Sequence, residues 1–296
     1  MPLALSGVFT ALVTPFKNGA VDEDAFVQLV VAQAEAGVDG VVPVGTTGES
    51  PTLSFDEHLR VVELAVTAAK DHHRQTPVIA GTGANSTEEA IELSQGAEKR
   101  GADGLLLVAP YYNKPSQEGL FLHFCKIADA VRIPIILYSI PGRCGVEIAV
   151  ETVARLAAAR KNIVAIKEAG GSVDRVSQLR QAVPDAFAIL SGDDGLTLPF
   201  LSVGATGVVS VASNIVPREM LELVRLFRSG NVAGAEALHR RLHPLFRDLF
   251  VETNPVPVKA ALARKGGMSG EVRLPLAPLA AASQIKLDAT LTALGL

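Results

Sequence analysis

Short apolar runs rich in β-forming residues alternate along this chain with longer segments of helical periodicity, and the alternation occurs eight times. The runs lie at residues 7–16, 39–47, 76–83, 104–112, 133–141, 162–169, 186–194 and 206–214. Strands that are apolar at nearly every position are typical of a parallel sheet covered on both faces. Eight strand–helix units ending near residue 230 therefore predict an α/β fold, a (β/α)8 barrel.

The segments between the runs predict the helices of such a barrel. The two clearest span residues 55–73 and 86–101. Ser86, with Glu89 three positions later, matches a capping box at the start of the second helix. The first run differs from the others, because a turn at "KNGAVDED" separates it from its helix.

A short glycine motif precedes three of the predicted strands. It reads "AGVDGVV" at 36–42, "RGADGLL" at 100–106 and "VGATGVV" at 203–209. In each copy a pair of glycines stands just before a strand, with one glycine at the C-terminus of the preceding helix. We interpret the motif as one helix-to-strand turn used three times, as expected of a repeating architecture.

Beyond the eighth unit the chain continues with helical periodicity from "NVAGAEALHRRLH" onward, and no low-complexity linker separates the two parts. We therefore expect a barrel domain at residues 1–230 and a C-terminal helical extension at 231–296.

Composition and charge exclude several classes of protein. The 296 residues are 48% hydrophobic with a formal net charge of −4, and the basic residues are scattered, so we expect no nucleic-acid partner and no membrane partner. No apolar run approaches the length needed to cross a bilayer. The start "MPLALSGVFTALVTPF" lacks the basic segment and cleavage site of a signal peptide and predicts a first buried strand.

The cysteines and histidines do not predict a metal site. Cys125 and Cys144 lack metal-ligand spacing and are too few for a disulfide framework, which favours a reducing, cytoplasmic location. His239 and His243 would share a helix face, but no carboxylate accompanies them, so we expect solvated histidines.

Polar residues at the carboxyl ends of the strands are the candidates for function, because active sites of (β/α)8 barrels lie there. All three tyrosines of the chain and one lysine occupy such positions. The candidates are Thr46, Thr47, Gly81, Gly83, Tyr111, Tyr112, Tyr138, Lys167, Gly192, Asp193, Ser210 and Asn214.

Lys167 stands near the end of the apolar run "NIVAIKEA". Alternation along this strand directs either Lys167 or Glu168 into the mouth of the barrel. A lysine among apolar neighbours has a lowered pKa, and its neutral amine can attack a ketone to give a Schiff base. Tyr138, on the preceding strand, would supply the proton transfers. The alternatives are a solvated lysine paired with Glu168, and a tyrosine that only packs in the core.

Two further strand ends carry groups suited to carboxylates. In "VPVGTTGESPT", Thr46 and Thr47 lie between glycines and can offer hydroxyl and backbone donors to an anion. Arg143, in "YSIPGRCGV", has a guanidinium whose geometry matches a second carboxylate. The alternatives are a turn rich in glycine and threonine, and a solvated loop arginine.

Six motifs in a fixed order carry a resemblance to a known family. They are "GTTGES", "YYNKPSQEGL", "YSIPGRCG", "IKEAGG", "SGDD" and "NPVPVKAAL". The sequence resembles the dihydrodipicolinate synthases, of the pyruvate-dependent Schiff-base aldolase family that includes N-acetylneuraminate lyase. The resemblance extends from "GVFTALVTPF" to the C-terminal helices and implies the TIM-barrel fold.

The resemblance implies a lyase that condenses pyruvate with aspartate semialdehyde in lysine biosynthesis, by the diaminopimelate route, without a metal or organic cofactor. It implies that Lys167 forms the Schiff base with pyruvate and that Tyr138 is the general acid and base. Thr46 and Tyr112 would complete a proton relay to solvent. The resemblance also implies a homotetramer, a dimer of dimers, in which Tyr112 reaches the site of the neighbouring subunit.

The same resemblance implies the residues that hold the substrates. Thr47 would bind the pyruvate carboxylate, Gly192 and Val209 would line the pocket through their backbones, and Arg143 would bind the carboxylate of aspartate semialdehyde. Two departures stand out: Ser139 replaces the more usual asparagine, and "GRCG" replaces the commoner "SRTG" or "PRTG". Neither departure removes a reacting group.

Two other functions share some of these residues. A pyruvate Schiff-base aldolase or dehydratase acting on a sugar acid would have the same Lys167 and Tyr138, but such enzymes resemble this chain less at "GTTGES" and "GRCG". A non-catalytic barrel that binds a small anion has no need of the relay formed by Thr46 and Tyr112.

Finally, the resemblance implies an effector site for L-lysine, the end product of the pathway. The matching positions are Ser50, Pro51, Phe55, His58, Asn85, Glu89 and Tyr111. Glu89 would pair with the ligand ammonium, while Asn85 and Tyr111 would bind its carboxylate. Phe55 departs from the polar or basic residue that is common there. The alternative is that Glu89 only caps its helix and that His58 is a solvated helix residue.

Overall fold

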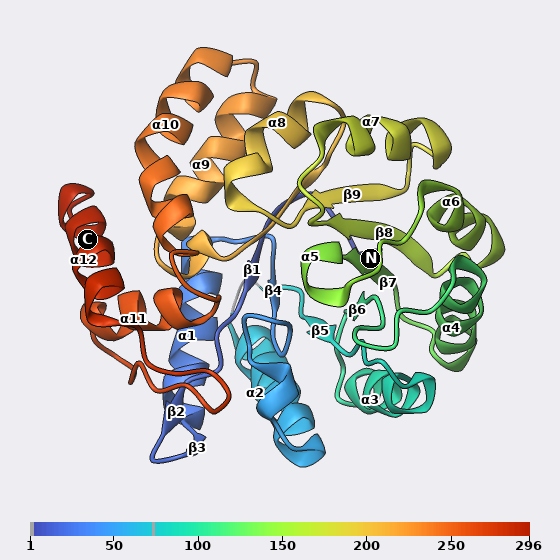
Figure 1. Ribbon diagram of the computed structural model, residues 1–296, viewed down its shortest axis with the longest axis horizontal. Coiled ribbons are helices and arrows are strands. Elements are labelled where there is room, and N and C mark those ends of the chain that lie inside the picture. The colour runs from blue at the N-terminus through green and yellow to red at the C-terminus, as the bar shows by residue number, and fades with distance from the viewer. Residues whose placement is uncertain (1–2, 73–74) are drawn as a thin grey trace.

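The computed structural model describes residues 3–72 and 75–296, and an eight-stranded parallel barrel lies at its centre (Figure 1). The barrel strands are β1 (Gly7–Ala11), β4 (Gly40–Val42), β5 (Ile79–Gly81), β6 (Gly104–Val108), β7 (Ile135–Ser139), β8 (Ile163–Glu168), β9 (Ala188–Ser191) and β10 (Gly207–Ser210). Their order is β4-β1-β10-β9-β8-β7-β6-β5, and a parallel bridge between Val41 and Val78 joins the two edges. The TIM-barrel prediction is confirmed, with every strand shorter than its apolar run.

Within the described part of the chain, eight helices surround the barrel in the order that the sequence predicts. They are α1 (Glu23–Ala36), α2 (Phe55–Asp71), α3 (Thr87–Lys99), α4 (Gln117–Ala130), α6 (Val150–Ala159), α7 (Val173–Ala182), α8 (Thr197–Ser202) and α9 (Pro217–Arg228). The final residue of the predicted helix 55–73 lies outside the described residues. A further short helix, α5 (Pro141–Cys144), lies in the loop after β7.

The helix starts differ in one detail from the sequence prediction. The Ser86 side chain caps α3 by accepting from the backbone N–H of Glu89, but the reciprocal bond of a capping box is not made there. The complete capping box is formed instead by Ser54 and Glu57 at the start of α2. The turn predicted before α1 is a two-stranded hairpin of β2 (Phe16–Lys17) and β3 (Ala20–Val21).

The recurrent glycine motif forms the same turn in all three places. Its first glycine has a left-handed backbone, with φ of 90° at Gly37, 86° at Gly101 and 103° at Gly204. Its second glycine opens a strand, and these residues are Gly40, Gly104 and Gly207. A side chain at Gly207 would lie 2.2 Å from the Gly7 carbonyl oxygen, so the strand can pair closely with β1 only because this position is glycine.

The inside of the barrel is a packed core rather than a pore. Alternate residues of the strands point inward, and the inward set includes Phe9, Val42, Ile79, Leu106, Ile136, Tyr138, Ala165, Leu190 and Val209. Most of these side chains are apolar, which is how barrels of eight strands fill their interior. Tyr138 belongs to this set at the carboxyl end of β7, where the interior opens into the mouth.

Three helices follow the barrel: α10 (Val232–Asp248), α11 (Val256–Lys265) and α12 (Ala281–Ala293). Figure 1 shows them on one side of the barrel, where α10 lies beside α8 and α9, and α12 packs against α10 and α11. Their apolar faces share a core cluster with residues of β1 and β10, including Val8 and Val208. The division at residue 230 falls between α9 and α10 and stays a prediction. Within the described residues, no helix combines the length and the apolar character needed to span a membrane.

Candidate active site

Lys167 and Tyr138 are neighbours across β8 and β7, as predicted from the strand order. The Lys167 Nζ atom lies 4.1 Å from the centroid of the Tyr138 ring, which is a cation–π contact. Both side chains are buried, at 6% and 4% exposure. Alternation therefore directs Lys167 inward, whereas the Glu168 carboxylate bonds to Arg175 of α7. The alternative of a solvated lysine paired with Glu168 is wrong.

Burial changes the protonation of this lysine. It lowers the pKa of Lys167 from the ordinary value of 10.5 to about 7, although the nearby carboxylate of Asp194 acts in the opposite direction. The guanidinium of Arg143 lowers the pKa further. A large share of the amine is therefore neutral at neutral pH, and only the neutral amine is a nucleophile.

Tyr138 keeps its proton under the same conditions. Burial raises the pKa of Tyr138 to about 12, and the hydrogen bond with Thr46 and the charge of Arg143 only partly oppose this. The phenol is therefore a hydrogen-bond donor that can give its proton to a reacting group and take one back from a stronger acid beside it. Thr46, in the loop after β4, is a hydrogen-bond partner of the Tyr138 side chain, as the family resemblance implies for a relay.

A cavity of about 180 Å³ opens at this end of the barrel. Its wall includes Thr46, Tyr111, Tyr138 and Arg143. Lys167 is not part of this wall, and its ammonium lies against the ring of Tyr138. The volume suits a small organic acid.

The loop after β4 is held in a strained form. Val44 is buried and has φ of 50°, a conformation that a β-branched residue rarely adopts and that costs about 1–3 kcal/mol. Glycines make the strain possible, because a side chain at Gly81 would lie 2.6 Å from the Val44 carbonyl oxygen. This strain presents Thr46 and Thr47 at the mouth of the barrel.

Asn254 connects two of the predicted substrate residues. Its side-chain Nδ2 donates to the Thr47 hydroxyl oxygen at 3.0 Å, and its backbone carbonyl oxygen accepts from Arg143 Nη2 at 3.1 Å. Sequence reasoning used "NPVPVKAAL" only as a motif of resemblance and missed this residue. No local signal identifies it, since Thr47 and Asn254 are 207 positions apart.

A buried ion pair fixes the loop after β4 to the C-terminal helix α11. Lys259 Nζ, on α11, lies 2.6 Å from Glu49 Oε1 and donates to the Thr14 carbonyl oxygen at 2.9 Å. Both side chains of the pair are at most 1% exposed. The second Glu49 oxygen accepts from the backbone N–H of Arg273. Since removing one partner from a buried pair costs about 3–5 kcal/mol, the loop depends on residues of the C-terminal helices.

Gly192 lies beside Lys167, but neither Gly192 nor Val209 belongs to the wall of the cavity of about 180 Å³, so their role in lining the pocket stays a prediction. A side chain at Gly192 would come within 3.1 Å of Lys167 Cε, so the glycine leaves room for the lysine. Val209 is buried in the interior cluster that also contains Tyr138. The sequence analysis missed Asp194, whose buried carboxylate accepts from the Ser210 hydroxyl and from two backbone N–H groups. Burial raises the pKa of Asp194 to about 6.

Tyr112 is not brought to the cavity by its own chain. Its side chain is 89% exposed, and its backbone has φ of 71°. Its neighbour Tyr111 is half-buried and lines the cavity instead. Within one chain the predicted relay therefore ends at Thr46.

A second cavity of about 150 Å³ adjoins the first. Six of the seven predicted effector positions line it, namely Ser50, Pro51, Phe55, His58, Glu89 and Tyr111. Asn85 is the exception and donates its side-chain amide to the Tyr111 carbonyl oxygen at 3.2 Å. Ser50, Pro51, Gly83 and Tyr111 belong to both walls.

His58 is buried and not solvated, so the alternative given for it is wrong. Its Nε2 lies 2.8 Å from the Gly81 carbonyl oxygen, and burial lowers its pKa to about 4. His58 is therefore neutral at neutral pH and donates through Nε2.

Comparison with known proteins agrees with this geometry. The model of the dihydrodipicolinate synthetase family matches residues 4–294. The 4-hydroxy-tetrahydrodipicolinate synthase of Geotalea uraniireducens is 53% identical over 98% of this chain and 99% of its own. The solved structure of that enzyme from Methylacidiphilum fumariolicum SolV has a TM-score of 0.96 with 58% identity, covering 99% of this chain and 96% of its own.

A third relative was solved with a ligand. The enzyme of Cyanidioschyzon merolae, solved with lysine bound, has a TM-score of 0.95 with 44% identity over 98% of both chains. A family model that spans almost the whole chain, and relatives that share more than half of its residues, leave one conclusion: the chain belongs to the dihydrodipicolinate synthetase family.

Proposed function

We propose that this protein is a 4-hydroxy-tetrahydrodipicolinate synthase, a lyase that condenses pyruvate with L-aspartate 4-semialdehyde in the diaminopimelate route to lysine. The observation that carries the proposal is the buried amine of Lys167, with its pKa near 7, against the hydroxyl-bearing ring of Tyr138. The names of close relatives that cover the whole chain support the choice of substrates.

The chemistry follows from the groups at the site. The neutral Lys167 amine attacks the C2 ketone of pyruvate, and loss of water from the carbinolamine gives the imine. A proton then leaves C3, and the resulting enamine attacks the aldehyde carbon of the second substrate. The amino group of that substrate displaces Lys167 from C2 and closes the ring, which frees the enzyme.

Tyr138 and Thr46 serve the proton transfers in these steps. Tyr138 gives a proton to the departing hydroxyl of the carbinolamine and takes one back as the next step proceeds. The bond from Thr46 to Tyr138 supports an exchange of that proton with the cavity. No step needs an oxidant or a metal, so we propose no cofactor.

Two polar groups are proposed to hold the substrate carboxylates. Thr47 has a hydroxyl whose oxygen already accepts from Asn254, which leaves its proton free to bind the pyruvate carboxylate. Arg143 lines the cavity and would bind the carboxylate of the semialdehyde.

We propose that the relay is completed by Tyr112 of a neighbouring subunit in a homotetramer of the dimer-of-dimers type. The exposure of Tyr112 supports this, because an 89% exposed side chain is free to reach a neighbouring subunit. One relative, 44% identical, is described as a monomeric variant, so assembly is a property to be measured. We also propose a cytoplasmic location, and a catalytic barrel domain at residues 1–230 whose site is held by contacts from the C-terminal extension.

The substrates are tested by initial rates with pyruvate and aspartate semialdehyde, beside a panel of sugar acids. We expect turnover of the semialdehyde and none above background with the sugar acids. In Arg143→Ala, kcat/KM for the semialdehyde is expected to fall about ten- to a hundred-fold, because a charge-assisted bond to a carboxylate contributes about 1.5–3 kcal/mol. Trapping of the pyruvate imine should persist in this variant.

Either of two results would contradict the assignment. Faster turnover of a sugar acid than of the semialdehyde would move the protein to the other aldolases. An unchanged kcat/KM for the semialdehyde in Arg143→Ala would remove the arginine from the binding site.

We further propose that L-lysine binds in the second cavity and inhibits. Glu89 would pair with an ammonium of the ligand, and His58 is buried and neutral in the same wall. Tyr111 belongs to the walls of both cavities, so a ligand that displaces Tyr111 in the second cavity changes the shape of the first. Phe55, 39% exposed, would cover the aliphatic stem of the ligand.

Millimolar L-lysine is therefore expected to lower the initial rate and to release heat in calorimetry. Glu89→Gln keeps the size of the side chain but removes its charge. The L-lysine concentration that halves the rate of this variant should therefore be about ten-fold higher, or more, than in the wild type. D-lysine is the matched control ligand. Inhibition of equal strength in Glu89→Gln, or none in the wild type, would remove the effector assignment without touching the catalytic one.

A further inference from the structure

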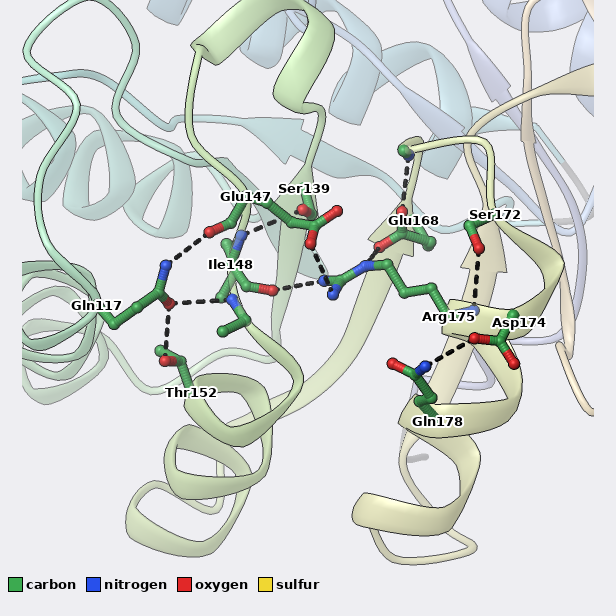
Figure 2. Close-up of polar contacts among 12 residues, drawn as sticks. Gln117, Ser139, Glu147, Ile148, Thr152, Glu168, Ser172, Asp174, Arg175 and Gln178 are labelled. Atoms are coloured by element: carbon green, nitrogen blue, oxygen red, sulfur yellow. Dashed lines mark hydrogen bonds and ion pairs between the residues drawn. The ribbon is translucent and has the colours of Figure 1, made fainter.

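Arg175, on α7, is a buried cation. It joins the end of β8 to residues 147–148, which follow α5 in the chain (Figure 2). Its side chain is 8% exposed. Its Nε donates to Glu168 Oε2 at 2.9 Å, and its Nη1 donates to Glu147 Oε2 at 3.2 Å. Its Nη2 donates to the carbonyl oxygen of Ile148. One guanidinium thus contacts two segments that carry different parts of the active site.

The first of these segments is the Arg143 loop, residues 140–147, which leaves β7 and returns to α6. It is tied at its base, because the Ile148 N–H donates to the Ser139 hydroxyl oxygen at 3.4 Å (Figure 2). Gln117 of α4 binds the loop segment just before α6. It donates to the Glu147 carbonyl oxygen at 2.8 Å and accepts from the Ala149 N–H at 3.0 Å. Ser139, one of the departures from the family pattern, therefore has a structural use in this chain.

The second segment is the end of β8, where Glu168 follows Lys167 directly. The Glu168 side chain is fully buried, and its Oε1 accepts from the backbone N–H of Gly170 at 2.7 Å. A buried carboxylate needs a cation and hydrogen bonds to compensate for lost hydration. Arg175 meets this need and is in turn oriented by it, because the carboxylate fixes one edge of the guanidinium.

We propose that Arg175 and Glu168 form a positioning pair that fixes the Arg143 loop relative to Lys167 and thereby governs use of the second substrate. The inference rests on the proposed function. Bond formation requires the enamine carbon and the aldehyde carbon to approach in one geometry, and a displacement of about 1 Å can cost about 10²-fold in rate. Arg175 touches no reacting atom and acts through Arg143.

Arg175→Lys is the first test, because lysine keeps the charge but cannot donate to three partners in one plane. We expect kcat/KM for aspartate semialdehyde to fall about ten- to a hundred-fold, with a lower kcat, because the displaced loop misaligns the two carbons that form the bond. The rate at which borohydride traps the pyruvate imine should stay within about two-fold of the wild type, because pyruvate bonds to Lys167 without the Arg143 loop. A loss shared equally by both substrates would overturn the proposal.

A matched control lies on the same helix. Arg180, also on α7, donates to the carbonyl oxygens of Phe187 and Val183 and makes no contact with the Arg143 loop. Arg180→Lys is expected to leave both measurements unchanged. If Arg175→Lys fails to fold in a thermal melt, Glu168→Gln takes its place, since glutamine keeps the size of the side chain and can still accept from Gly170.

A double-mutant cycle separates positioning from general stability. In an Arg143→Ala background, Arg175→Lys should cost nothing further with the semialdehyde, because its effect passes through Arg143. Independent, additive losses would contradict the proposal. The outcome is distinct from failure of the proposed function, which would show as the absence of a trapped pyruvate imine in the wild type.

Discussion

Replacing Lys167 with alanine is expected to abolish turnover, with a loss on the order of 10³-fold or more, because none of the described residues in the cavity wall supplies another amine to form the imine. Borohydride with pyruvate should inactivate the wild type and add one reduced pyruvate group to the peptide that contains residue 167. An activity assay measures the inactivation, and peptide mass spectrometry detects the added group. Labelling that survives in Lys167→Ala would contradict the assignment.

The pH dependence of imine formation gives the same residue a second test. Burial lowers the pKa of Lys167 to about 7, and the neutral amine is the reactive form. The rate of imine formation should therefore rise with pH through about 7 and level off above it, well below the 10.5 of an ordinary lysine. A rise that continues to pH 10 would show that the amine is solvated.

Replacing Tyr138 with phenylalanine is expected to lower kcat about 10²- to 10⁴-fold, the range for loss of a general acid and base. The phenylalanine ring keeps the 4.1 Å contact with the lysine ammonium, so the substitution removes only the hydroxyl. Imine formation should be slowed as strongly as overall turnover, because dehydration of the carbinolamine needs the same proton. Stopped-flow and steady-state rates measure the two.

Thr46→Val is the companion variant, since valine matches threonine in shape and lacks the hydroxyl that bonds to Tyr138. We expect a smaller loss than in Tyr138→Phe. A Tyr138→Phe rate within about two-fold of the wild type would mean that another group moves the proton.

The fold was predictable because its signals are local. Each strand is a run of apolar residues, and three of the helix-to-strand turns have their own glycine, as Gly37 shows at the end of α1. The ends of the strands were less well predicted, since runs such as 39–47 continue apolar beyond the last ladder bond at Val42. The hairpin at Phe16 was missed because its strands have two residues each.

The site was predictable only in part. Lys167 and Tyr138 lie on adjacent strands, so the order of the strands brings them together. The pattern did not decide between Lys167 and Glu168, because both faces of β8 are buried and alternation has no polar side to reveal. The register and the Arg175 bond to Glu168 decide it in the structure.

The partners that hold the site were not predictable. Asn254 bonds to Thr47, and Lys259 pairs with Glu49, across 207 and 210 positions of sequence. Such pairs follow from how the C-terminal helices pack on the barrel, and a single sequence carries no signal for them. In the sequence, Lys259 of α11 also looks like an ordinary exposed helix residue.

The pair between Glu49 and Lys259 has a consequence for the order of events during synthesis. A ribosome delivers the β4 loop early and Lys259 some two hundred residues later, since the partners are 210 positions apart. A nascent chain that has emerged only as far as α10 can assemble barrel strands, because domains form from the N-terminus as they are made. Its Glu49 then lacks a cation, so the loop that presents Thr46 and Thr47 takes its final form only after α11 has left the ribosome.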